Sequence, residues 1–244
     1  KAVDALVTLM KEKPLFIADG HHRYETSLVY KEQMRKENGT LKDDMPFDYV
    51  MMVCVSMSNP GLKILPAHRL LRNIDERCFE RIIPTLKESF HVEPLDKGCK
   101  VDDFMSKLNG EAGGNAFVMY VGKTDTCYKL RLINQKALDA VFSNTHPEWK
   151  SLDAGILHGL IINKILGITS NDVSLKNYVK YVKEETEAIS LVRSGEYQLA
   201  FFLRPTRIEQ VKEIAEARKV MPPKSTYFYP KLITGIVINS LCDA

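Results

Sequence analysis

The 244-residue sequence predicts a mixed α/β fold, and three observations lead to this class. Stretches with apolar residues at helical spacing alternate along the chain with short runs rich in Val, Met, Tyr and Phe. Turn signals such as Asn59-Pro60-Gly61 separate neighbouring runs. Hydrophobic residues make up 45% of the chain and charged residues 27%, which is typical of globular proteins with a buried core.

The N-terminal part is expected to begin with helix, strand and helix. Apolar residues at helical spacing predict a helix over 2–11, and Pro14 then breaks the pattern. A short buried strand is expected at 15–18. The helical pattern returns over 21–36 and ends at Gly39, a residue type that often follows the last helical turn.

The middle of the chain is expected to be rich in strands. A central strand is predicted at 47–57, and a second strand at 62–65 closes a hairpin with it. Residues 75–90 have a helical pattern that Pro84 must kink or divide. The next elements are expected to be a strand at 91–95, a helix at 101–108, and strands at 116–121 and 127–133 that form a second hairpin.

The C-terminal part alternates between the two element types. A strongly apolar helix is expected at 152–166, ended by Gly167. After it we expect a strand at 178–182, a helix at 184–192, a strand at 198–203, a helix at 208–217 and a strand at 235–239.

Composition excludes several functional classes. The net charge of +3 is mild and does not indicate a dedicated nucleic-acid binder. The most apolar helical stretch is interrupted by Asp153, His158 and Lys164, which argues against a membrane span. The five cysteines are dispersed without zinc-site spacing, so we expect reduced thiols in a cytoplasmic protein.

The stretch Asp19-Gly20-His21-His22-Arg23 is the strongest candidate site. Glycine lets the backbone turn sharply and approach a ligand. The helix that follows has unpaired N–H groups and the positive end of its dipole at this point, which together favour an anion. The two histidines add donors, and arginine can bind a phosphate through two parallel hydrogen bonds. Asp19 could cap the helix, orient a histidine, or help to hold a metal bound to phosphates.

A purely structural interpretation of the same block is available. Asp19 would be a helix cap, the histidines would be polar surface, and Arg23 would pair with Glu25 or with solvent. Three consecutive cationic or titratable residues on one helical turn disfavour one another unless an anion lies among them. The residue types therefore favour an anion site.

Two further clusters could join this site. His68 and Arg69 follow an expected strand directly, at a place where loop residues often line binding sites. The second cluster consists of Lys224, Ser225, Thr226 and Lys231. The glycines of a P-loop are absent from it, so we reject a P-loop there. The alternative is an ordered loop whose tyrosines pack on the rest of the protein.

Five motifs resemble a bacterial and archaeal family of uncharacterised domains known as DUF1015: FIADGHHRYETSLVY, LPAHRLL, LDAGILHGLI, FFLRPT and MPPKSTYFYPKLITGIVI. The Asp-Gly-His-His-Arg block is also similar to that of free-serine kinases, which have a ParB/sulfiredoxin-like fold. The motifs cover nearly the whole chain in the same order. Two positions depart from the family pattern, because Ala67 stands where Thr is expected and Pro223 where Gln is expected.

The resemblance implies a nucleotide phosphate site at Asp19, Gly20, His21, His22 and Arg23. In the kinases, a nucleotide such as ATP or ADP donates phosphate to the hydroxyl of free serine, chemistry that suits a cationic cluster and Mg²⁺. A carboxylate in a segment before the block accepts the hydroxyl proton in those enzymes. Here only eighteen residues precede the block, so that base is expected to be missing from this chain or from the protein.

These considerations leave two main hypotheses. In the first, the chain is a nucleotide-dependent phosphotransferase in which Arg23 holds phosphate, His22 donates to the transferred group, and Asp19 orients His22 or holds Mg²⁺. Lys224 and Lys231 would close over the site. In the second, the chain is a non-catalytic, nucleotide-sensing module of ParB type. A nuclease is the weakest alternative, because the carboxylate pairs that hold catalytic metals are not evident.

Three regions are expected from the resemblance and the pattern of elements. Residues 1–74 would form part of the ParB/sulfiredoxin-like phosphate-binding region and 75–145 a smaller α/β region. Residues 146–244 would form a C-terminal α/β region that packs back on the first. The stretch 142–151 is the linker candidate, with an exposed Trp149. Because the chain starts inside a helical pattern without Met, we expect an N-terminally truncated fragment or a processed form.

Overall fold

The computed structural model describes residues 1–39, 44–95, 105–106, 108, 114–143, 147–169, 172–233 and 235–241. The chain forms two compact units. Unit 1 comprises Lys1–Lys63 with Phe228–Ala244, and unit 2 comprises Ile64–Tyr227. The fold is mixed α/β, as the sequence predicts. The division into three regions stays a prediction.

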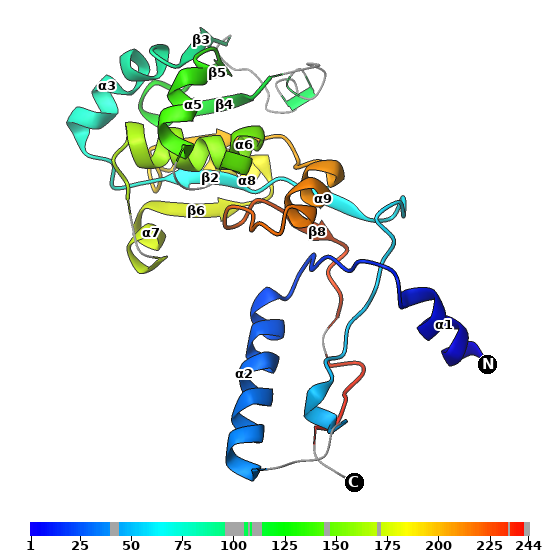
Figure 1. The fold of residues 1–244 in the computed structure, drawn as a ribbon. Helices are drawn as coiled ribbons and strands as arrows, with labels where there is room; N and C mark the ends of the chain where they lie inside the picture. Colours follow the sequence, from blue (N-terminus) through cyan, green and yellow to red (C-terminus); the bar gives the residue numbers. More distant parts are fainter. Residues whose placement is uncertain are drawn as a thin grey trace. The chain divides into compact units, whose positions relative to one another are not determined.

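Unit 1 is built around two helices, α1 (Ala2–Met10) and α2 (His21–Asn38), followed by the short 3₁₀-helix η1 (Pro46–Asp48) (Figure 1). Both helices confirm the helical patterns expected at 2–11 and 21–36. α2 ends at Gly39, whose φ of 70° lies in the left-handed region that glycine adopts without strain.

The predictions of three strands in unit 1 are wrong. Residues 15–18 are irregular and mostly exposed, 47–57 contain η1 followed by irregular backbone, and 235–239 are bends and irregular chain. The apolar side chains of the last segment are exposed, with Ile238 at 84%. A short apolar run resembles a strand in its residue types, but a strand also needs a ladder partner, which the run itself does not specify.

Unit 2 is organised around a six-stranded antiparallel sheet with the order β3-β5-β4-β7-β2-β6. Its strands are β2 (His68–Leu71), β3 (Phe90–Pro94), β4 (Ala116–Val121), β5 (Thr126–Leu132), β6 (Val179–Val182) and β7 (Leu199–Phe202). β4 and β5 confirm the hairpin expected at 116–133. The hairpin expected between 47–57 and 62–65 is wrong, because β1 (Lys63–Leu65) pairs with β8 (Tyr227–Tyr229).

The helices of unit 2 are α3 (Glu76–Lys87), α5 (Gln135–Phe142), α6 (Asp153–Ile156), α7 (Asp172–Tyr178), α8 (Glu185–Arg193) and α9 (Ile208–Glu216). The short 3₁₀-helix η2 (Gly122–Thr124) lies between β4 and β5, and η3 (Pro147–Ser151) lies between α5 and α6. Pro84 lies inside α3, as expected. The helix expected at 101–108 lies largely outside the described residues. No helix in the described ranges is long and apolar enough to cross a bilayer.

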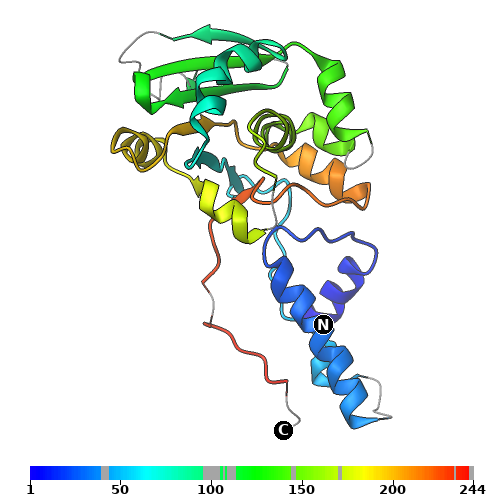
Figure 2. The same cartoon turned by 90° about the vertical axis from the view of Figure 1, so that its left-hand side faces the viewer.

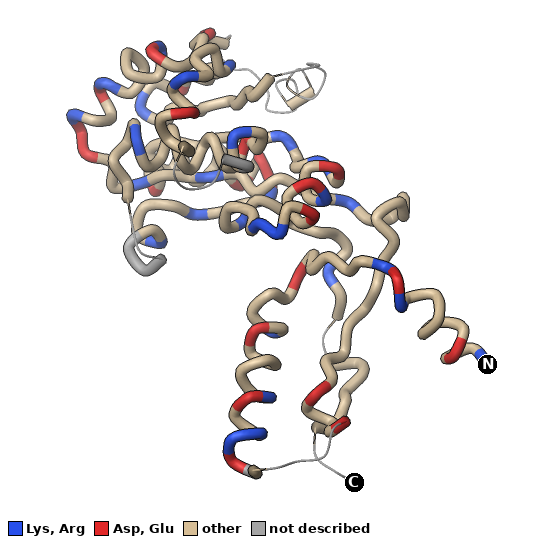
Figure 3. The backbone as a smooth tube through the Cα atoms, in the orientation of Figure 1, with Lys and Arg blue, Asp and Glu red and all other residues tan. Residues whose placement is uncertain are grey.

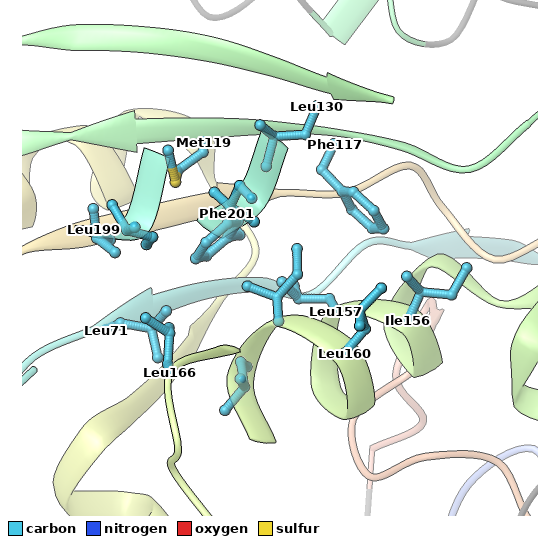
Figure 4. Packing of buried hydrophobic residues seen from close by; sticks show 14 of the residues in the cluster. Leu71, Phe117, Met119, Leu130, Ile156, Leu157, Leu160, Leu166, Leu199 and Phe201 are labelled. Atoms are coloured by element: carbon cyan, nitrogen blue, oxygen red, sulfur yellow. The ribbon is translucent and has the colours of Figure 1, made fainter. Parts of the chain in front are cut away.

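Helices lie on both sides of the sheet (Figure 2). The side chains of β4 alternate between two buried clusters, one on each face. Phe117 and Met119 pack on one face against η4 (Leu157–Ile165), the helical segment that follows α6, whose Leu157 and Leu160 point toward the strands (Figure 4). Val118 and its neighbours pack on the other face, against α8. Burying a Phe or Leu side chain contributes about 1.5–3 kcal/mol, so both faces stabilise unit 2.

The apolar helix expected at 152–166 is present but unusual. After α6 it widens into the π-helix η4 (Leu157–Ile165), where Leu166 N–H donates to the Ile161 carbonyl at 2.9 Å. A Cβ at Gly159 would lie 2.6 Å from the Phe142 ring, so glycine permits the close approach of η4 and α5.

Trp149 differs from its expected exposure. It is half-buried, packs against the core, and donates a 2.8 Å hydrogen bond to the Val220 carbonyl. The linker candidate 142–151 belongs to unit 2, although 144–146 lie outside the described residues.

Candidate phosphate-binding site

The start of α2 presents backbone donors to solvent. Gly20 precedes the helix with a φ of 82°, and the first intrahelical hydrogen bond runs from Tyr24 N–H to the Gly20 carbonyl at 3.0 Å. The N–H groups of residues 21–23 therefore precede the first intrahelical hydrogen bond and lie at the positive end of the helix dipole. This backbone geometry suits an anion.

Arg23 folds back over Gly20. A Cβ at position 20 would lie 2.9 Å from Nη2 of Arg23 and 3.0 Å from its Nε. Both the positive φ and this contact require glycine, and together they place the guanidinium beside the free N–H groups. The Arg23 side chain is 68% exposed, so it remains accessible to a ligand.

Asp19 joins two cations. Lys231 Nζ donates to its Oδ1 at 2.9 Å, and Arg23 Nη2 donates to its Oδ2 at 3.4 Å. The hydrogen bond from Lys231, followed by the charges of Lys231 and Arg23, lowers the pKa of Asp19 despite partial burial. Unit 1 thus brings Lys231 to Asp19, and closure of Lys224 and Lys231 over the site stays a prediction.

The histidines are exposed at the same helix start. His22 Nδ1 lies 3.1 Å from Glu25 Oε2, and its side chain is 99% exposed. Glu25 therefore contacts His22, whereas the structural interpretation assigned it to Arg23. Asp19 bonds to Lys231, to Arg23 and to the backbone of Gly20, and orientation of His22 by Asp19 stays a prediction.

These pairs are weak enough for a ligand to displace. Exposed ion pairs contribute about 0–1 kcal/mol, and the 3.4 Å contact of Arg23 with Asp19 is longer than a strong charge-assisted bond. Both signs of charge occur along α2 (Figure 3). Both oxygens of Asp19 face cations, which fits a carboxylate bridge better than a metal ligand. Within the described ranges there is no group of three or more His, Cys, Asp and Glu placed to hold a metal.

The second cluster differs from its expected setting. His68 and Arg69 lie on β2 rather than in a loop, and both are buried. His68 Nδ1 accepts a hydrogen bond from Leu203 N–H at 3.3 Å, so the ring proton belongs on Nε2. Nε2 lies 3.2 Å from Glu185 Oε1 but is poorly aligned for a hydrogen bond. This contact lowers the pKa of Glu185.

Arg69 points to the opposite face of the sheet. It donates to the Ala67 carbonyl and, at 3.2 Å, to the Lys224 carbonyl, and it lies 5.4 Å from the centre of the Tyr181 ring. Burial lowers its pKa to about 10. Burial, and then the charge of Arg69, lowers the pKa of His158 on η4. Unit 2 thus brings His68, Arg69 and Lys224 into one region.

The Lys-Ser-Thr segment is held in place as a loop. Ser225 is buried and its Oγ donates to the Pro222 carbonyl at 2.6 Å, while Thr206 Oγ1 donates to the Ser225 carbonyl at 2.9 Å. Thr226 is half-buried, and Lys224 is exposed with a φ of 56°. These bonds agree with the ordered loop considered above, and a binding role for these residues stays a prediction.

Sequence reasoning assigned Glu25 to Arg23 rather than to His22, and it missed Glu185. Glu25 stands three residues after His22 on α2, a spacing that places side chains on one helix face and could have suggested the pair. Glu185 meets His68 only through the packing of α8 on the sheet, and no local pattern indicates it.

The chain is similar to solved structures at low identity. A conserved hypothetical protein from Pyrococcus furiosus aligns at 16% identity over 87% of this chain and 68% of its own, with a TM-score of 0.42. A free serine kinase in complex with AMP aligns at 14% identity over 93% and 78%, also at 0.42. A mutant free serine kinase in complex with ADP aligns at 15% identity over 87% and 66%, at 0.40.

Comparison with curated proteins gives no match. The family model described as "Protein of unknown function (DUF1015)" matches residues 1–155, more than half of the 244 residues. Two of the motifs that predicted this family, FIADGHHRYETSLVY and LPAHRLL, lie within the matched residues. The chain therefore belongs to the DUF1015 family.

Proposed function

We propose that the protein is a cytoplasmic, nucleotide-dependent phosphotransferase that acts on the hydroxyl of a small metabolite, with free L-serine as the leading substrate. The observation that carries the proposal is the gathering of Gly20, His21, His22 and Arg23 at the exposed start of α2. The similarity of this block to that of free-serine kinases supports it. In this proposal the block belongs to a ParB/sulfiredoxin-like region.

Each residue of the block has a distinct role. Arg23 and the first N–H groups of α2 bind the phosphates of ATP or ADP, and His21 adds a donor. His22 donates a hydrogen bond to the transferred group, where negative charge accumulates. Asp19 positions Arg23 and Lys231, because its bonds already go to these two cations.

The transfer joins the substrate oxygen to the terminal phosphorus of the nucleotide. The bond from that phosphorus to the bridging oxygen breaks, the shortened nucleotide leaves with the electron pair, and the proton of the substrate hydroxyl passes to water. The lowered pKa of Asp19 makes it a poor acceptor for this proton. We therefore assign Asp19 to positioning rather than to general-base catalysis.

Nucleotide titration tests the phosphate site. Calorimetry with ATP, ADP and CTP, with and without Mg²⁺, is expected to show binding that Arg23→Gln weakens about tenfold, since bonds to charged groups contribute roughly 1.5–3 kcal/mol. Lys36→Gln, near the other end of α2, removes the same charge and is the matched control. Equal affinity in the two variants would remove the site from α2.

A second candidate is a nucleotide-sensing module. Lys231 reaches Asp19 from 212 positions along the chain, so an anion that competes for Lys231 or Arg23 would loosen the C-terminal segment. Incubation with labelled nucleotide and an amino-acid pool separates the two functions. A phosphorylated amino acid supports the transferase, and binding without transfer supports the sensor.

A further inference from the structure

Unit 2 contains a cavity that shares no residue with the phosphate-binding block. Its volume is about 500 Å³, which lies within the range of small-molecule sites. Phe79 of α3, Val192 of α8 and Tyr197 supply apolar wall, while Lys123 and Arg193 bring positive charge to it. Apolar walls with a few placed polar groups are typical of ligand pockets.

Two contacts orient the Arg193 side chain, which is 58% exposed. Its Nε donates to the Tyr120 hydroxyl at 3.3 Å, and its Nη2 lies 3.5 Å from Asp125 Oδ1. The Tyr120 hydroxyl in turn donates to the same carboxylate oxygen at 2.5 Å. These bonds use Nε and Nη2, and Nη1 carries two further N–H groups. A guanidinium held in this way loses little side-chain freedom when it binds an anion.

Lys123 provides a second cation from another element. It belongs to η2 and lies 3.6 Å from Glu76 Oε1 at the start of α3. This distance and the 3.5 Å contact of Arg193 with Asp125 are both long for charge-assisted hydrogen bonds, which are about 2.7–2.9 Å. Both cations can therefore form shorter bonds to a third anion than to their present partners.

Two glycines shape the wall of the cavity. A Cβ at Gly195, whose φ is 82°, would have no neighbour within 4 Å, so that part of the wall is open. A Cβ at Gly122 would lie 2.8 Å from Val192 Cγ1, so η2 packs tightly on α8 there. Gln198 is fixed by two bonds to the backbone of Ile74, at 2.8 and 3.1 Å. The cavity is thus largely preformed.

We propose that this cavity is a second ligand site, which binds a small molecule with an apolar body and one anionic group. Phe79 and Val192 contact the body, and Lys123 and Arg193 bind the phosphate or carboxylate. Glu76 opposes the ligand by its charge and competes for Lys123. The cavity and the α2 block share no residue, so substitutions can test the two sites separately.

Calorimetric titration with three probes tests the site. Phenyl phosphate and phenylacetate carry the two candidate anions on the same apolar ring, and benzyl alcohol is the neutral control. Binding of either anion, with little binding of the alcohol, is expected. Phenyl phosphate alone would indicate a phosphate ligand, and phenylacetate alone would indicate a carboxylate.

Substitutions around the cavity should change ligand affinity in opposite directions, according to the charge that each one removes. Lys123→Gln and Arg193→Gln are expected to weaken binding about tenfold each, whereas Glu76→Gln should tighten it. Lys87→Gln, an exposed position on the same α3 helix, should leave it unchanged. Glu76→Gln is surface-exposed and its gain in affinity cannot be produced by unfolding.

Several outcomes overturn the proposal. They are an absence of binding, equal binding of benzyl alcohol, or equal affinities in the Lys123→Gln, Glu76→Gln and Lys87→Gln variants. Binding of phenyl phosphate that Arg23→Gln abolishes and Arg193→Gln spares would assign the ligand to α2. That result would remove the cavity site and leave the proposed function intact.

Discussion

Because Gly20 has no Cβ, it permits both the backbone turn at the start of α2 and the position of Arg23 in the candidate site. Gly20→Ala would introduce the strain of a positive φ and push the Arg23 guanidinium away. We expect the free energy of unfolding to fall by about 1 kcal/mol and nucleotide affinity to fall as well. Urea denaturation and calorimetry measure the two effects.

Gly39→Ala is the matched control for this change. Gly39 also has a positive φ, but a Cβ there meets no neighbour within 4 Å. The control should lose stability and keep its nucleotide affinity. Equal losses of affinity in both variants would mean that backbone strain, and not the place of Arg23, controls binding.

Lys231 should control the ionisation of Asp19. Its hydrogen bond is the largest cause of the lowered Asp19 pKa, so Lys231→Gln should return that pKa toward the ordinary value of 3.8. A carboxyl with a lowered pKa stabilises the folded state above its ordinary pKa, and this stabilisation is lost as the pH falls through the lowered value. The pair is exposed, so the effect should be only a few tenths of a kcal/mol.

An NMR titration of the Asp19 carboxyl carbon measures this change directly. Lys36→Gln removes the same charge from the far end of α2 and should leave the titration in place. An unchanged Asp19 titration in Lys231→Gln would argue against the contact between the two residues.

At the scale of elements, α3 depends on its N-cap. Asp75 Oδ1 accepts hydrogen bonds from the N–H groups of Arg77 at 3.0 Å and Cys78 at 3.3 Å. Asp75→Ala should lower the free energy of unfolding by about 1 kcal/mol, measured by urea denaturation followed through Trp149 fluorescence. Glu80→Ala, an exposed change within the helix, should have a smaller effect, and a larger one would refute the role of the cap.

The packing of α8 on β2 should depend on pH. The pKa of Glu185 is lowered, first by its contact with His68, so this contact stabilises unit 2 above about pH 4.5 and is lost as the pH falls through the lowered value. Glu185→Gln should therefore cost about 1 kcal/mol at pH 7 and little near pH 3. Denaturation at several pH values measures the difference.

Glu187→Gln on the same helix provides the comparison, because Glu187 makes an exposed pair with Lys180 at 3.4 Å. Its effect at pH 7 should be smaller than that of Glu185→Gln. A pH-independent loss of unfolding free energy in Glu185→Gln would indicate that side-chain packing rather than charge holds α8 on the sheet.

The elements also show what local patterns can predict. Most helices and the β4–β5 hairpin follow from spacing and turn signals, because these depend on neighbouring residues. The strand expected at 47–57 is absent, since ladder pairing depends on distant chain. His68 and Arg69 were expected in a loop because they directly follow the strand predicted at 62–65. They lie on β2 instead, where contacts from distant segments, such as Glu185 with His68 and the Lys224 carbonyl with Arg69, accompany their burial.

At the scale of the whole molecule, the two units differ in how much of their apolar side chains they bury. Phe201 is fully buried in the core of unit 2, and Phe201→Ala should lower the free energy of unfolding by about 3–5 kcal/mol. Ile236→Ala in unit 1 truncates a side chain that is 73% exposed. This substitution should change the free energy of unfolding by less than about 0.5 kcal/mol. Trp149 reports on unit 2 in both experiments, and equal effects would contradict the burial described here.

The candidate site was predictable where it is local and unpredictable where it depends on the whole chain. The residues from Asp19 to Arg23 form a site on one helix start, so glycine and the adjacent cations were enough to indicate it. Lys231 was only one of two candidate lysines, and the structure assigns it to Asp19. The cavity beside Lys123 and Arg193 was missed, because separate segments contribute its walls.

The wide turns of η4 affect how this protein can change in length. In an ordinary α-helix, loss of one residue rotates every later side chain by about 100° and would move apolar residues out of the core. In η4, where the Leu166 N–H reaches back to Ile161, a one-residue deletion can be absorbed by tightening a turn. A variant that lacks one residue of this stretch is therefore expected to keep the flanking segments in register.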